Sequence, residues 1–238
     1  MTRQVSAITL TQAVADHLRR LIHRGDVAPG ERLPPERELA EQLGVARISL
    51  REAIKVLRED GYLEVRRGSS GGTYVSGLSR PAEAWRSRMR ERAGEIDDIL
   101  DFRIALETES AILAAQRWEP SDLDRLEKSV DTLVDVTTRA EFRQADSRFH
   151  VGLAGAARSD RLQEAIQASR GELFIPRDLL PFSEPVAETL RDHRAILTAV
   201  RDRSADRASA AMREHLERTR RQLREIVVGT GDQASTIA

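Results

Sequence analysis

Residues 35–60 read PERELAEQLGVARISLREAIKVLRED, and this stretch decides the fold of the N-terminal part of the chain. Its apolar residues recur at spacings of three and four, which is the period of amphipathic helices. The pattern predicts one helix over about 35–43, a tight turn at Gly44, and a second helix from about Ala46 to the residue before Asp60. Two short helices joined in this way are typical of a helix-turn-helix, whose second helix lies in the major groove of DNA.

The sequence on either side completes this plan. A third amphipathic helix is predicted upstream, over residues 8–23. Downstream, two β-prone runs at 62–65 and 73–75 enclose a basic, glycine-rich segment at 66–72, which predicts a hairpin. Three helices followed by a hairpin indicate a winged helix-turn-helix.

The rest of the chain has helical periodicity and no strand pattern. Residues 77–94 are rich in Ser, Pro and Arg and predict a linker or a short connecting helix. Six helices are then expected, near 95–117, 121–136, 139–156, 159–175, 184–203 and 205–228. We therefore expect a mainly α protein with a winged helix-turn-helix over 8–76 and an all-α helical bundle over 95–228.

Composition excludes several classes of protein. The 238 residues suit two domains, and the absence of Cys excludes disulfides and zinc–thiolate sites. No run of eighteen apolar residues occurs, and the N-terminus lacks the apolar core of a signal peptide, so a cytoplasmic protein without a membrane partner is expected. The formal charge is +3 for residues 1–80 and −4 for the remainder, which weakly favours a nucleic-acid-binding head.

The predicted recognition helix and the hairpin tip carry the candidate DNA contacts. Arg47 and Arg51 lie one helical turn apart, and the arginine fork matches guanine O6 and N7. Glycine at the tip permits a close approach to the minor groove or a phosphate. The alternative is that the arginines are solvated surface charges. The full candidate set is Arg37, Arg47, Ser49, Arg51, Arg66, Arg67 and Gly68.

These residues lie within motifs that resemble the DNA-binding domain of the GntR family. The matching segments are 30–40, 44–47, 50–53 and 61–63, and the resemblance covers nearly all of residues 8–76. It implies that Arg37, Arg47, Ser49, Arg51 and Gly68 contact operator DNA.

Two positions depart from the family pattern. Ala46 stands where a Ser or Thr usually caps the recognition helix, and the loss of such a cap costs about 1 kcal/mol. Pro35 replaces another capping Ser, although proline is well tolerated where a helix begins.

Four polar residues lie on the apolar faces of predicted C-terminal helices: Asp146, His150, His193 and His215. Burying a carboxylate and imidazoles without partners is unfavourable, and a divalent metal ion would satisfy all four. Asp146 and His150 are one turn apart, as two ligands of one ion can be. An Asp/His₃ set favours Zn²⁺, with Ni²⁺, Mn²⁺ or Fe²⁺ as alternatives. Histidines satisfied within the core are the other interpretation.

Arg103 is a second polar residue among apolar neighbours, in the helix predicted over 95–117. A buried guanidinium requires a carboxylate. Glu107, four residues further on, can supply it within the helix. Alternatively, Arg103 binds an anionic effector beside the metal ion.

The C-terminal half resembles the FCD domain, the ligand-binding domain of FadR-type GntR regulators. The matching segments are 102–107, 146–150, 192–197 and 212–216, within about 95–225. The resemblance implies that the metal ligands are this Asp and these three His. It also supports an effector-binding Arg103, because small organic acids and their relatives are typical effectors.

The function predicted is that of a ligand-responsive transcription regulator, which binds double-stranded operator DNA as a homodimer. It is a repressor or an activator, and we favour a repressor. A metallohydrolase is an alternative, because a three-His site with open coordination positions can activate water. A sensor whose only effector is the metal ion is another. The winged helix-turn-helix favours a regulator over an enzyme.

Overall fold

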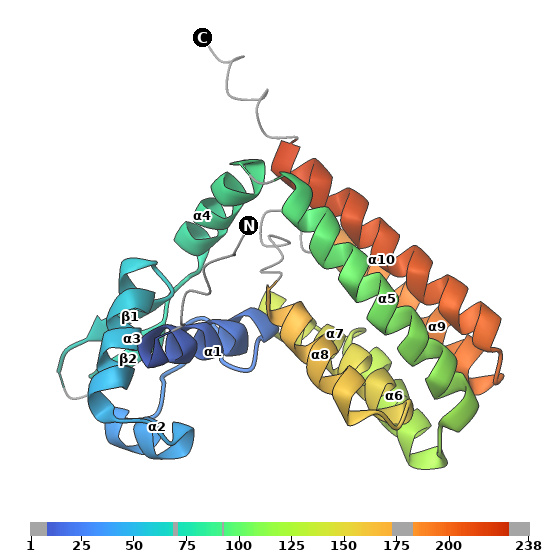
Figure 1. Cartoon of the computed structure of the whole chain (residues 1–238), viewed down its shortest axis with the longest axis horizontal. Coiled ribbons are helices and arrows are strands. Elements are labelled where there is room, and N and C mark those ends of the chain that lie inside the picture. The colour runs from blue at the N-terminus through green and yellow to red at the C-terminus, as the bar shows by residue number, and fades with distance from the viewer. Residues whose placement is uncertain (1–8, 69–70, 92, 173–182, 229–238) are drawn as a thin grey trace, which may run out of the picture. The chain divides into compact units, whose positions relative to one another are not determined.

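The computed structural model describes residues 9–68, 71–91, 93–172 and 183–228. In chain order (Figure 1), its elements are α1 (Leu10–Arg24), α2 (Glu36–Leu43), α3 (Arg47–Glu59), β1 (Leu63–Arg66), β2 (Gly72–Val75), α4 (Ser79–Glu91), α5 (Ala93–Arg117), α6 (Pro120–Thr132), α7 (Arg139–Ala156), α8 (Asp160–Glu172), α9 (Ser183–Arg201) and α10 (Ala205–Val228). The mainly helical class and the hairpin that the sequence predicts are confirmed for the described part of the chain.

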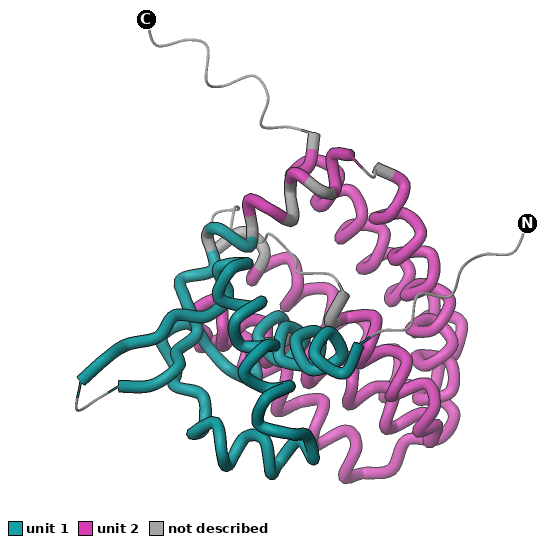
Figure 2. The backbone as a smooth tube through the Cα atoms, turned by 60° about the vertical axis from the view of Figure 1, so that its left-hand side comes forward, with its two compact units in different colours: residues 1–81 teal, residues 82–238 magenta. Residues whose placement is uncertain are grey.

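The chain divides into two compact units, residues 1–81 and residues 82–238 (Figure 2). Helix α4 spans this division and occupies most of the segment 77–94. The sequence left a linker and a connecting helix both open for this segment, and the structure shows the helix.

The helices of the N-terminal unit pack through the apolar faces that the sequence predicts. The buried side chains of α1 and α3 include Val14, Leu18, Ile22, Leu50, Ile54 and Leu57. Helix α2 ends at Gly44, which has φ +64° and returns the chain toward α3. A residue with a Cβ would be strained there, so glycine sets the turn of the helix-turn-helix. Ala46 precedes α3 without a side-chain cap, as expected from its methyl group.

The wing contains one more pairing than the sequence predicts. Strands β1 and β2 are antiparallel, with Leu63 opposite Val75. The segment just before α2 also bonds to β2: the Leu33 amide donates to the Thr73 carbonyl over 2.9 Å, and the Val75 amide donates to the Glu31 carbonyl over 2.9 Å. This segment was not recognised as extended because it is too short to show alternation and two prolines follow it.

In the C-terminal unit, α5 packs against α7, α8, α9 and α10. Figure 1 shows α5 and α10 side by side. The largest fully buried side chains of this unit include Leu100, Leu126, Phe149 and Leu153. The four predicted metal-binding residues lie within this core, so helix packing positions them.

One helix is shorter than predicted. The helix expected over 121–136 ends at Thr132 as α6. Helix α7 then begins with a capping box, in which Thr138 and Glu141 each bind the other's backbone amide. A capping residue has extended backbone angles, so the chain must leave the helical conformation before it can start α7. The end of the helix expected over 159–175 lies outside the described residues.

No described helix is both long enough and apolar enough to cross a membrane.

Candidate metal centre

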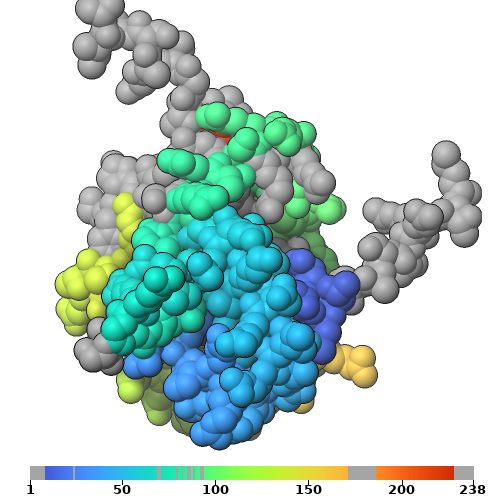
Figure 3. Space-filling view, turned by 90° about the vertical axis from the view of Figure 1, so that its left-hand side faces the viewer, coloured from blue at the N-terminus to red at the C-terminus, as the bar shows by residue number. Residues whose placement is uncertain are grey.

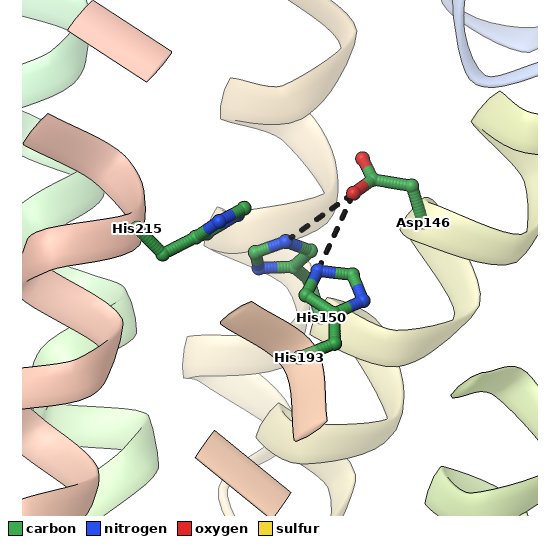
Figure 4. A group of neighbouring side chains, drawn as sticks. All are labelled: Asp146, His150, His193 and His215. Atoms are coloured by element: carbon green, nitrogen blue, oxygen red, sulfur yellow. Dashed lines mark ion pairs between the residues drawn. The ribbon is translucent and has the colours of Figure 1, made fainter. Parts of the chain in front are cut away.

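Three helices bring the four predicted ligands into one buried cluster. Asp146 and His150 come from α7, His193 from α9 and His215 from α10, and their side chains point toward one another (Figure 4). All four are buried, and one candidate ligand atom from each lies within 4.8 Å of the others. Residues up to 69 positions apart therefore form a single cluster, as the sequence analysis predicted.

The spacing of the ligand atoms suits a metal ion. Asp146 Oδ1 lies 3.4 Å from His193 Nε2 and 3.8 Å from His150 Nε2. Zinc–ligand bonds of about 2.1 Å place two ligands of one ion roughly 3–4 Å apart. His150 Nε2 and both ring nitrogens of His193 have no hydrogen-bond partner among the described residues. The interpretation of a satisfied histidine core does not account for these nitrogens.

Carboxylates orient two of the three imidazole rings. His150 Nδ1 donates to Glu107 Oε2, because an ionised carboxylate can only accept a hydrogen bond. His215 Nδ1 lies 3.2 Å from Asp192 Oδ2. Each bond leaves the Nε2 lone pair of its histidine available, which is the usual arrangement behind metal-binding histidines. The third ring, His193, stacks on Phe149 with centroids 3.9 Å apart.

These orienting roles were not predicted from the sequence, which pairs Glu107 only with Arg103 and gives no role to Asp192. Asp192 directly precedes His193 in sequence, but nothing local shows that its carboxylate faces α10.

Burial keeps the histidines in the form that binds metal. Desolvation lowers the pKa of His150 to about 4 and lowers the pKa of His193 well below its usual value. Both rings are therefore neutral at pH 7, and a metal ion would not have to displace a proton from either.

Arg103 has the internal partner that the sequence allowed. Its side chain is 2% exposed, and its Nε donates to Glu107 Oε1 over 2.7 Å. Burial opposes the charge on Glu107, but Arg103 and His150 outweigh it and hold the pKa of Glu107 below its usual value. Glu107 thus bridges Arg103 to His150, and Arg103 is tied to the cluster through one carboxylate.

A second arginine, which the sequence analysis missed, contacts the cluster. Arg170 from α8 donates to Asp146 Oδ2 over 2.5 Å, and its side chain is 7% exposed. It lies one helical turn after Ile166, a buried residue, and this spacing was the available signal. Arg103 and Arg170 therefore each contact a carboxylate of the same site.

The helical DNA-contact candidates lie in the N-terminal unit, whose surface is drawn in blue to teal in Figure 3. Arg37, Arg47 and Arg51 are exposed. Arg51 Nε donates to Glu36 over 2.8 Å, and Arg37 donates to Glu41 over 3.1 Å. Exposed ion pairs of this kind contribute little stability, so phosphates or bases could replace them at small cost. Ser49 is half-buried on the same helix as Arg47 and Arg51.

The wing residues form a separate group. The Arg66 guanidinium lies 4.2 Å from the ring centroid of Tyr74 and pairs with Glu64 over 2.6 Å. Arg67 is exposed, and Gly68 has φ +104°, which requires glycine. Residues 69–70 of the tip lie outside the described residues.

Two family models match this chain. Residues 10–75 match the family model "Bacterial regulatory proteins, gntR family", and residues 98–218 match the FCD domain. The chain is 35% identical over 225 residues to RmpR of Mycobacterium gastri, which is described as an HTH-type transcriptional regulator; the match covers 91% of this chain and 81% of RmpR. It is 32% identical to the Uxu operon transcriptional regulator of Escherichia coli K12, over 94% of this chain and 91% of that protein.

A solved structure shows the same fold. Escherichia coli McbR/YncC matches with a TM-score of 0.57 at 20% sequence identity, over 91% of this chain and 97% of that one.

Proposed function

The chain belongs to the GntR family and carries an FCD domain. From this premise, we propose that it is a repressor whose C-terminal domain binds one divalent metal ion and a small carboxylate-bearing effector. These two ligands would regulate its binding to DNA. It is a transcription regulator and not an enzyme. The relatives that it matches are transcription regulators as well. The observation that carries the proposal is the buried cluster of one Asp and three His, with imidazole nitrogens that have no hydrogen-bond partner among the described residues.

Zinc is the ion that we propose for this site, with Ni²⁺, Mn²⁺ and Fe²⁺ as alternatives. Imidazole and carboxylate ligands suit all four ions. Four protein ligands would leave coordination positions on an ion that accepts five or six, and an effector carboxylate could take them. Arg103 would be the effector's second contact.

The N-terminal domain would bind operator DNA in the cytoplasm as part of a homodimer. A symmetric dimer reads a palindromic site, because each recognition helix contacts one half-site. Effector binding and DNA binding would be coupled reciprocally: an effector that weakens DNA binding must itself bind more weakly when DNA is present.

A sensor whose only effector is the metal ion is the second candidate. Four ligands suffice for a structurally complete zinc site, and this favours it. Equilibrium DNA binding by metal-free and zinc-loaded protein, each with and without small carboxylic acids, separates the two. A response to metal alone supports the metal sensor, and a further response to an acid supports the effector-regulated repressor.

Replacing Arg47 or Arg51 with alanine should weaken specific DNA binding by about 1–3 kcal/mol each, because each arginine would lose its contacts to a base. The measurement is fluorescence anisotropy on a palindromic duplex selected from random DNA with the wild-type protein. Arg58→Ala is the matched control, because Arg58 is exposed near the other end of α3. If both variants keep wild-type affinity for the selected duplex, α3 is not the recognition helix.

Replacing Arg103 with lysine should raise the effector concentration that releases half of the bound DNA by about tenfold or more, while operator binding stays unchanged. Lysine keeps a cation beside Glu107 but lacks the planar fork that holds a carboxylate with two hydrogen bonds. The measurement is a titration of small mono- and dicarboxylic acids into the preformed protein–DNA complex. A variant that responds like the wild type would leave Arg103 as the structural partner of Glu107 only.

A further inference from the structure

Two buried cations and two buried anions surround the predicted ligands. The side chains of Arg103 and Glu107 are 2% and 1% exposed, and those of Arg170 and Asp146 are each 7% exposed. Each arginine pairs with one carboxylate, Arg103 with Glu107 and Arg170 with Asp146. These four charges sum to zero.

A divalent metal ion would make this group of side chains doubly positive. Asp192, a further carboxylate next to the ligands, is already shared between His215 and Arg218. It therefore does not offset the charge of the ion. Uncompensated charge in a buried site is expensive, and these carboxylates of the described residues are already paired, so an added anion would balance the charge of the ion.

Arg170 is placed to bind such an anion. Its contact with Asp146 uses one terminal nitrogen, while its buried Nε has no hydrogen-bond partner among the described residues. The same Asp146 carboxylate faces His150 and His193 through its other oxygen, so Arg170 is separated from the ligand atoms by a single carboxyl group.

We propose that Arg170 is a second anion-binding residue of this site and that the effector is a small organic dianion of the dicarboxylate class. Its two negative charges would offset the two positive charges of the ion, and Arg103 and Arg170 would donate hydrogen bonds to it. A monocarboxylate would leave one positive charge buried. This inference rests on the proposed metal and effector site.

The first test compares acids that differ only in one carboxylate. The probe pairs are malate with 2-hydroxybutyrate and succinate with butyrate, titrated by calorimetry into zinc-loaded full-length protein. At least one diacid should bind wild type about tenfold or more tightly than its partner, as an additional charge-assisted hydrogen bond predicts. Arg170→Gln should reduce that preference to about twofold or less. Arg161→Gln, which changes an exposed arginine of the same helix, should keep it.

The second test does not depend on the identity of the acid. In buffer without carboxylates or phosphate, Arg170→Gln should bind zinc more tightly than wild type, because one repelling charge is gone. If Arg170 served only to hold Asp146 in place, the same substitution would weaken zinc binding. Arg170→Lys, which keeps the charge, should not gain affinity, and thermal melts of both variants check that they fold.

The outcomes separate this inference from the proposed function. Zinc binding without a preference for any diacid, or a preference that Arg170→Gln leaves intact, overturns the role of Arg170 and leaves the metal site standing. A wild-type protein that binds no divalent metal overturns both. Zinc content measured after each titration shows whether an acid has only removed the ion.

Discussion

A chelator is expected to lower the melting temperature of the metal-loaded wild-type protein by roughly 8–16 °C and to leave that of the His193→Ala, His215→Ala double variant almost unchanged. The four ligands come from three helices, so they are together only in the folded chain. An ion that binds only the folded state stabilises it by about 4 kcal/mol when its free concentration is a thousandfold above Kd. The measurement is a thermal melt followed by circular dichroism, with and without chelator, with metal content determined by mass spectrometry.

His17→Ala is the control, since His17 lies on α1 in the other unit and is not part of the cluster. It should lose stability on chelation to the same extent as the wild type. An equal response of wild type and double variant would argue that the three histidines form a satisfied core and hold no ion.

Glu107→Ala should reduce the free energy of unfolding of the metal-free protein by about 3–5 kcal/mol, because it leaves a buried charge without its partner. Glu107 accepts from both Arg103 and His150, so the substitution also removes the bond that orients the His150 ring. The effect should be seen in urea unfolding in the presence of chelator, which excludes any contribution from bound metal.

Glu109→Ala is the matched control for this second prediction. Glu109 lies on the same helix two residues further on and is exposed, and such surface substitutions usually change stability by less than about 0.5 kcal/mol. If Glu107→Ala is as stable as the control, another group compensates the charge of Arg103, and the Arg103–Glu107 pair does not stabilise the site.

The helices, the wing and the identity of the four candidate ligands could be predicted from the sequence. Each of these follows from local information. Gly44 takes the left-handed conformation that ends α2, and the capping box of Thr138 and Glu141 sets the start of α7. A polar residue on the apolar face of a helix can also be identified from the sequence, because the helical period shows that it faces the core.

Only the tertiary structure decided what those inward-facing groups contact. Arg170 meets Asp146 across 24 residues of sequence, His150 meets Glu107 across 43, and His215 meets Asp192 across 23. Helical periodicity shows which face of a helix is buried but not which helix packs against it or at what height. The pairing of residues 31–33 with β2 could not be predicted from the sequence either, because an extended segment of that length is too short to show an alternating pattern. The sequence therefore determined that the polar residues face the core, and helix packing determined how their charges pair.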